Sequence, residues 1–229
     1  MATSERLRIL LEDATAVSAL LQVPGGARAA CVLAPGAGAG MEHPFMAAMA
    51  GGLADRGIAV LRYQFPFMEK GSKRPDPPAV AHAAVRAAVA EAARRLPGLP
   101  LFAGGKSFGG RMTSQAQALS PLPGVRGIVF AGFPLHPAGR PSSERAAHLS
   151  GVEVPMLFLQ GTRDALAETG RIEALTRELG PRASLHVIEG ADHAFHVLAR
   201  SGRTDRQALD EMLDAAASWI EIMGSDSIF

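Results

Sequence analysis

Ser107 lies at the centre of a glycine-rich stretch, residues 104–110, whose spacing could make a serine a nucleophile. A Gly-x-Ser-x-Gly pattern is typical of a sharp turn between a strand and a helix, with the serine at the apex in a strained backbone conformation. Side chains two positions away on either side would collide across the bend, and Gly105 and Gly109 remove those collisions. The pattern therefore predicts an exposed Ser107 hydroxyl suited to attack on an acyl carbon.

Two other interpretations of the glycines fail at particular residues. A phosphate-binding P-loop needs a glycine five positions before the Gly-Lys-Ser tripeptide, and that position is Pro100. A dinucleotide-binding fingerprint that starts at Gly36 or Gly38 would need its last glycine at Met41 or His43.

A serine hydroxyl is a weak nucleophile at neutral pH, so Ser107 needs a base within hydrogen-bond reach and an acid to orient that base. Asp164 and His193 are candidates, because each directly follows a late apolar run that we interpret as a strand. Asp192 and Glu168 remain alternatives for the acid.

The elements that must position these residues alternate along the chain. Continuous apolar runs predict strands, and stripes at helical spacing with Pro, Gly and capping signals predict helices. We expect strands near residues 20–23, 29–34, 58–63, 101–106, 127–132, 154–161 and 184–189, and helices near 44–56, 77–95, 107–119, 170–179 and 204–223. Asp76 is expected to cap the second helix, and residues 1–28 to add antiparallel edge strands. The alternation predicts an α/β fold with a doubly wound, mainly parallel sheet flanked by helices, in one domain over residues 1–229.

The phrases at 35–38, 104–111 and 133–137 carry a family resemblance. The chain resembles the α/β-hydrolase superfamily over about residues 28–223, and within it small lid-less serine hydrolases similar to dienelactone-hydrolase-like enzymes. Those phrases further resemble a subgroup that includes a subunit of the non-specific-lethal chromatin complex. Because the segment 133–153 is short where many hydrolases insert a lid, we expect an open or thinly covered site.

The resemblance implies a catalytic triad with Ser107 as nucleophile, Asp164 as acid and His193 as base. Authentic dienelactone enzymes use cysteine at the nucleophile position, so their substrate cannot be carried over.

An oxyanion hole should accompany such a triad. Its first donor is expected to be the backbone N–H of Phe108, and its second that of Ala37, with Gly38 as the alternative. His43 and His136 lie on loops that could face the site, which makes them candidate substrate contacts.

Composition narrows the function classes. A net charge of +1 gives no electrostatic argument for nucleic acid or an anionic membrane surface. The single cysteine, Cys31, lies in an apolar run, and no stretch reaches transmembrane length, so we expect a cytoplasmic protein with a buried free thiol. The histidines lack metal-ligand spacing, and we expect neither a metal nor another cofactor.

Basic residues near the predicted site have less specific interpretations. The long loop 64–78 follows the strand at 58–63, where loops often border ligand sites. Its Lys70, Lys73 and Arg74 are more typical of a solvated surface cluster than of an anion site. Lys106 is interpreted as part of the turn rather than as a catalytic amine.

Two functions follow from these observations. The first is a serine hydrolase that cleaves a small ester, thioester or related acyl substrate through an acyl-enzyme on Ser107. The alternative is a non-catalytic interaction module on the same fold. The oligomeric state is not indicated by the sequence.

Overall fold

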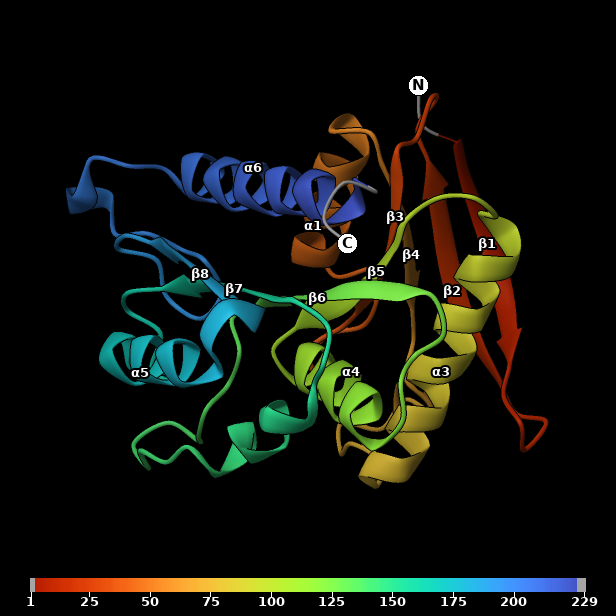
Figure 1. Ribbon diagram of the computed structural model, residues 1–229, viewed down its shortest axis with the longest axis horizontal. Helices are drawn as coiled ribbons and strands as arrows, with labels where there is room; N and C mark the ends of the chain where they lie inside the picture. The colour runs from red at the N-terminus through yellow and green to blue at the C-terminus, as the bar shows by residue number, and fades with distance from the viewer. Residues whose placement is uncertain (1–2, 226–229) are drawn as a thin grey trace.

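The computed structural model describes residues 3–225, in which eight strands form one sheet flanked by helices (Figure 1). The strand order is β1-β2-β4-β3-β5-β6-β7-β8. The strands are β1 (Thr3–Leu10), β2 (Ala16–Val23), β3 (Ala29–Ala34), β4 (Ile58–Tyr63), β5 (Leu101–Lys106), β6 (Val125–Ala131), β7 (Met156–Gly161) and β8 (Ala183–Ile188). The six strands from β4 to β8 in this order pair in parallel, which confirms the predicted α/β class.

Helices cover both faces of the sheet (Figure 1). α1 and α6 pack on one face, and α3, α4 and α5 pack on the other. The helices are α1 (Pro44–Asp55), α2 (Pro66–Glu69), α3 (Pro78–Arg95), α4 (Phe108–Leu119), α5 (Thr169–Leu179) and α6 (Asp205–Gly224), with short 3₁₀ turns η1 (Glu144–Gly151), η2 (Gly180–Arg182) and η3 (Ala199–Ser201). This arrangement places the loops after the parallel strands along one edge of the sheet.

β3 shows why a continuous apolar run marks a central strand. Cys31 and Leu33 pack toward α1 and α6, and Ala30 and Val32 pack toward the opposite layer. Because successive side chains point to opposite faces, a strand covered on both sides needs apolar residues at every position.

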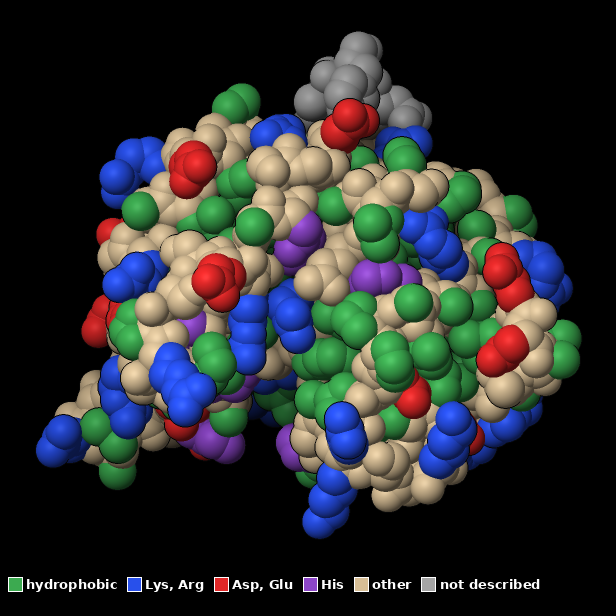
Figure 2. All heavy atoms as spheres, turned by 90° about the horizontal axis from the view of Figure 1, so that it is seen from below, with side chains coloured by type: hydrophobic (Ala, Val, Ile, Leu, Met, Phe, Trp, Pro, Cys, Tyr) green, Lys and Arg blue, Asp and Glu red, His purple; other side chains and the backbone are tan. Residues whose placement is uncertain are grey.

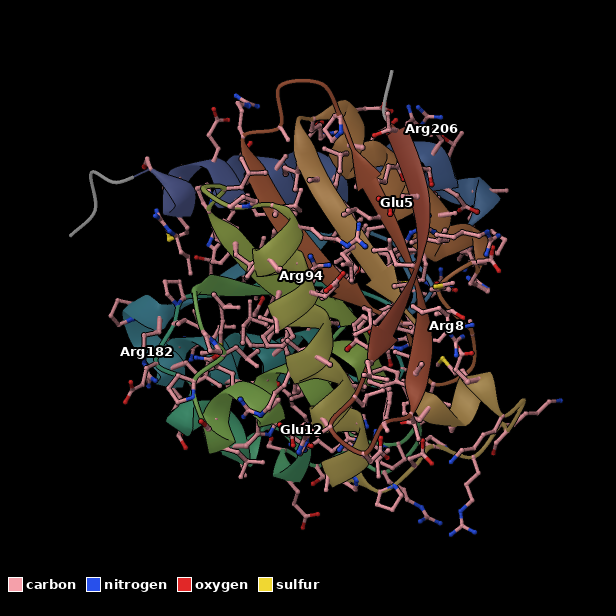
Figure 3. All side chains as sticks on the ribbon, turned by 90° about the vertical axis from the view of Figure 1, so that its right-hand side faces the viewer. Glu5, Arg8, Glu12, Arg94, Arg182 and Arg206 are labelled. Atoms are coloured by element: carbon pink, nitrogen blue, oxygen red, sulfur yellow. The ribbon has the colours of Figure 1, made fainter. Side chains whose placement is uncertain are left out.

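The first two strands form the predicted antiparallel edge. β1 and β2 pair from Thr3 with Val23 to Leu10 with Ala16, and β2 then pairs antiparallel with β4. Figure 3 looks onto this edge, with Glu5 on β1 near α3. Both carboxylate oxygens of Glu5 accept from Arg95 Nη1, at 3.0 and 3.1 Å, which joins the edge strand to α3.

Asp76 does not cap α3, so that part of the prediction is wrong. The N-cap residue is Pro77, and the helix begins at Pro78. A residue before proline prefers extended backbone, and proline is favoured at the first helical position. The two prolines therefore start the helix one residue beyond the position that the Asp76 side chain would cap.

The surface has mixed charge. Figure 2 shows basic and acidic side chains interspersed with hydrophobic ones on the face seen from below. Within residues 3–225, no helix combines the length and apolar character needed to cross a membrane.

Candidate active site

The turn between β5 and α4 has the strained geometry that the glycine spacing predicts. Ser107 has φ 49° and ψ −114°, a conformation that L residues rarely adopt. A Cβ at Gly105 would lie 2.2 Å from the carbonyl oxygen of Ala34, and one at Gly109 would lie 2.4 Å from the same atom. Only glycine fits at both positions, so the turn can press against the end of β3 while the Ser107 side chain projects away from it.

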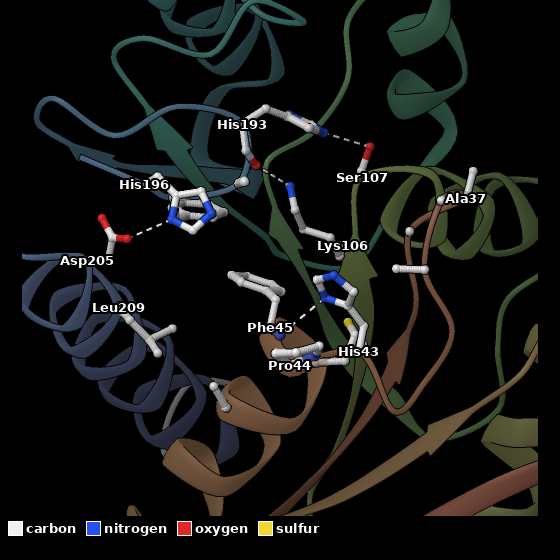
Figure 4. Close-up of a pocket in the computed structure, with 17 residues that line it drawn as sticks. Ala37, His43, Pro44, Phe45, Lys106, Ser107, His193, His196, Asp205 and Leu209 are labelled. Carbon is white, nitrogen blue, oxygen red and sulfur yellow. Dashed lines mark hydrogen bonds and ion pairs between the residues drawn. The ribbon is translucent and has the colours of Figure 1, made fainter. Parts of the chain in front are cut away.

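His193 reaches Ser107 from the loop after β8 (Figure 4). Its Nε2 lies 2.9 Å from Ser107 Oγ, and its Nδ1 lies 2.7 Å from Asp164 Oδ2. The imidazole thus lies between a hydroxyl and a carboxylate. With the Nδ1 proton donated to Asp164, Nε2 is free to accept the hydroxyl proton.

Asp164 is fixed by contacts other than the histidine. Its side chain is fully buried, Oδ1 accepts from the Leu166 N–H at 2.8 Å, and Oδ2 accepts from Gln160 Nε2 at 2.5 Å. The Oε1 of Gln160 accepts from the Phe133 N–H at 3.0 Å. The sequence pattern predicts no role for Gln160. A lone amide at the end of an otherwise apolar strand could have indicated one, because a buried amide requires hydrogen-bond partners.

The two alternative acids lie elsewhere. Asp192 Oδ1 accepts from the N–H groups of Ala194 and His196, at 2.8 and 2.9 Å, and so shapes the His193 loop. Glu168 pairs with His136 at 3.1 Å. Of the three candidate carboxylates, the structure brings Asp164 to His193.

The expected oxyanion donors lie beside Ser107. Phe108 is the first residue of α4, so its N–H has no acceptor within the helix. Ala37 and Gly38 occupy the corner of a turn closed by a 3.3 Å hydrogen bond from the Ala39 N–H to the Gly36 carbonyl. Both residues line the same pocket as Ser107. Their assignment as donors stays a prediction.

A pocket of about 640 Å³ opens next to the Ser107 and His193 side chains (Figure 4). Its walls come from the loop after β3, the start of α1, the loop after β8 and the start of α6. Most of the lining is apolar. The lining residues away from Ser107 and His193 include Pro44, Phe45, Met46, Ala48, Phe195 and Leu209.

Of the two candidate substrate contacts, His43 and His136, only His43 lies at the pocket. His43 lines the pocket, and its Nδ1 accepts from the Phe45 N–H at 3.2 Å, which caps α1. His136 does not line the pocket. Its side chain is 1% exposed, with Nε2 3.1 Å from Glu168 Oε2 and Nδ1 2.8 Å from the Pro137 carbonyl. The structure therefore places His136 in a buried contact with the loop after β7.

Loop 64–78 supports the turn rather than lining this pocket. The rings of Phe65 and Phe67 meet the Phe108 ring edge to face, with centroids 5.3 and 6.1 Å apart. The position of this loop after a parallel strand predicts that it borders a ligand site, but none of its residues lines this pocket. The pocket instead takes its apolar wall from α1 and α6, whose contribution depends on packing that the sequence does not display.

The fold is shared with known proteins. Residues 27–221 match the family model described as an alpha/beta hydrolase domain. A dienelactone hydrolase from Anabaena variabilis superposes with a TM-score of 0.77 at 20% identity, covering 96% of this chain and 98% of that one. A serine hydrolase homologue from Coxiella burnetii superposes with a TM-score of 0.74 at 17% identity, covering 93% of this chain and 96% of that one. A serine hydrolase without lid from Xanthomonas campestris superposes with a TM-score of 0.73 at 18% identity, covering 94% of each chain.

These matches define the class of the protein. The chain belongs to the alpha/beta hydrolase domain family. It shares its fold with small hydrolases that include a lid-less member. The narrower resemblance to a chromatin-complex subunit stays a prediction.

Proposed function

We propose that this protein is a serine hydrolase that cleaves a small ester, thioester or related acyl compound through an acyl-enzyme on Ser107. The observation that carries the proposal is the chain of contacts from Ser107 Oγ to His193 Nε2 and from His193 Nδ1 to Asp164, at 2.9 and 2.7 Å. These contacts sit at a strained strand-to-helix turn and open onto an apolar pocket. Catalysis by a serine hydrolase needs a nucleophile, a base that contacts it and an acid that orients the base.

Acylation begins when Ser107 Oγ attacks the substrate carbonyl carbon and His193 Nε2 takes the hydroxyl proton. The carbonyl oxygen becomes an oxyanion, which the N–H of Phe108 and an N–H of the Ala37–Gly38 turn stabilise. Each such donor is worth about 3 kcal/mol of transition-state stabilisation. His193 then gives its proton to the departing alkoxide or thiolate as the bond to the leaving group breaks.

Deacylation uses the same groups with water as the nucleophile. His193 takes a proton from water, the new C–O bond forms, and the bond between Ser107 Oγ and the acyl carbon breaks. The proton returns to Oγ, and the carboxylic acid leaves. Asp164 accepts from His193 Nδ1 and stabilises the imidazolium that forms in each half-reaction.

The pocket indicates the kind of substrate. Apolar side chains from α1 and α6 face Ser107 across a volume of about 640 Å³. Burial of apolar substrate surface there contributes roughly 25 cal/mol for each Å² removed from water. We therefore propose an uncharged acyl compound of small to medium size as substrate.

Replacing the nucleophile tests this function. Ser107→Ala should lower the hydrolysis of a short-chain p-nitrophenyl ester by at least about 10⁴-fold, because no other group can form the acyl-enzyme. Ser120→Ala is the matched control, since Ser120 is exposed at the far end of α4. Undiminished turnover in Ser107→Ala would overturn the assignment.

Active-site labelling separates catalysis from the alternative of a non-catalytic module. A fluorophosphonate should attach covalently to Ser107 in the wild-type protein, because the probe reacts with an activated serine. Mass spectrometry of the labelled peptide locates the adduct. A wild-type protein that stays unlabelled would favour the interaction module.

A further inference from the structure

Lys106 is the last residue of β5 and directly precedes Ser107, yet the proposed reaction does not use it. Its ammonium donates a hydrogen bond to the backbone carbonyl of His193 at 2.5 Å (Figure 4). The lysine thus spans from the nucleophile turn to the loop that carries the base. The two ends of this contact are 87 residues apart in the sequence.

Two aromatic rings lie beside the lysine cation. The rings of Phe45 and Phe195 stack on each other with centroids 5.7 Å apart, and Lys106 Nζ lies 5.7 and 5.3 Å from their centres. A cation near an aromatic face is attracted by the ring quadrupole. Burial lowers the pKa of Lys106 to about 8, although the charges of Asp164 and Asp192 oppose this change. Ring faces and a carbonyl hold the ammonium, and no carboxylate within residues 3–225 forms a salt bridge with it.

The His193 loop has its own internal supports. Asp192 accepts two backbone N–H groups of the loop, and the Arg163 N–H donates to the Ala191 carbonyl at 2.8 Å. These contacts shape the loop and attach it to the loop after β7. The Lys106 hydrogen bond attaches the His193 peptide itself to the turn that carries Ser107.

We propose that Lys106 is a positioning residue that holds His193 at hydrogen-bond distance from Ser107. This inference rests on the proposed function, because it assigns Lys106 an effect on the nucleophile and base of that reaction. A catalytic pair displaced by about 1 Å loses about 10²-fold in rate. Substrate binding is unaffected when only the base moves, so the loss should appear in kcat.

The test compares Lys106→Met with Lys106→Arg. Methionine keeps an apolar side chain of similar length and removes the donor, and arginine keeps both donor and charge. Lys106→Met should lower kcat for a p-nitrophenyl ester by about 10- to 100-fold with KM within about 2-fold, and should slow fluorophosphonate labelling equally. Lys106→Arg should recover most of the loss. Lys70→Met, on the exposed part of loop 64–78, is the control.

Three outcomes would overturn the inference. Lys106→Met could match the wild type in kcat, it could change KM alone, or Lys106→Arg could fail to recover a loss seen in a folded Lys106→Met. Thermal unfolding of each variant identifies a folding defect. Failure of the proposed function looks different, because then the wild-type protein itself would not react with the fluorophosphonate.

A pH profile gives a second measurement that does not depend on Lys106→Met folding. The wild-type rate should fall as pH rises through about 8, because the lysine loses the charge that strengthens its bond to the carbonyl. The titratable groups around it are Asp164, Asp192, His193 and, in the lining of the same pocket, His43, His196 and Asp205. All six are present in Lys106→Arg, whose guanidinium stays charged, so that variant should lack the fall. Identical alkaline limbs in the two proteins would count against the inference.

Discussion

At the scale of single residues, the Asp164 carboxylate is held by three hydrogen bonds of different origin. Gln160 donates from β7, Leu166 donates from the backbone, and His193 contributes its Nδ1. A fully buried carboxylate stays ionised only when such donors compensate its lost hydration. The same donors fix the direction in which it orients the imidazole.

Removing the charge of Asp164 without changing its shape tests its role. Asp164→Asn should lower kcat by about 10³- to 10⁴-fold, because an amide in this position favours the wrong tautomer of His193. Asp192→Asn is the matched control, since its side-chain oxygen can still accept from Ala194 and His196. Steady-state ester hydrolysis checks both. Equal losses in the two variants would contradict the choice of Asp164.

At the scale of elements, α2 anchors loop 64–78 to the edge of the sheet. Glu69, its last residue, accepts from the Ser18 N–H on β2 at 2.7 Å and from Arg8 Nη1 on β1 at 3.1 Å. The same loop places Phe65 and Phe67 against Phe108. By accepting from β1 and β2, the Glu69 carboxylate on α2 therefore supports the aromatic cluster under the nucleophile turn.

The contribution of Glu69 should depend on pH. Burial raises the pKa of this carboxyl, but the hydrogen bonds from Ser18 and Arg8 outweigh it and hold the pKa below its usual value. A lowered pKa stabilises the fold above the unfolded pKa, near 4.3, and this stability is lost as pH falls through the folded pKa.

Glu69→Gln should therefore lower the free energy of unfolding by about 0.5–1 kcal/mol at pH 7, because water screens this exposed carboxylate, and the difference should shrink below about pH 4. Urea unfolding at both pH values measures it. Glu12→Gln, on an exposed turn, serves as the control. A difference that persists unchanged at pH 3 would contradict the electrostatic origin.

At the scale of the whole molecule, the central sheet separates two helix layers, and β3 lies near its middle. Cys31 on β3 is 1% exposed and packs with α1 and α6. Burial in this apolar layer raises the pKa of its thiol to about 12. The thiolate is the reactive form, so the native fold protects this cysteine both sterically and electrostatically.

Thiol modification should consequently report global unfolding. At pH 8 the native protein should react with a disulfide reagent such as DTNB far more slowly than the unfolded chain, and the rate should rise with denaturant together with the change in Trp219 fluorescence. Cys31→Ala provides the blank. Prompt stoichiometric modification of the native protein would show that the layer over β3 opens locally.

The sequence by itself determined the local features of this protein. Apolar runs and capping signals predict the parallel strands and the principal helices, because both depend on neighbours close along the chain. The glycines around Ser107 predict the strained turn for the same reason, since the collisions they avoid arise within a few residues or against the adjoining strand. The positions of Asp164 and His193 after their strands follow from topology.

Only the tertiary structure decided which side chains meet. It selected Asp164 over Asp192 and Glu168, placed His136 away from the pocket, and built the pocket wall from α1 and α6 instead of loop 64–78. It also joined Lys106 to His193 across 87 positions of the sequence. Such contacts depend on how several loops pack at one edge of the sheet, and that packing minimises buried, unpaired polar groups over the whole fold. No short stretch of sequence carries this information.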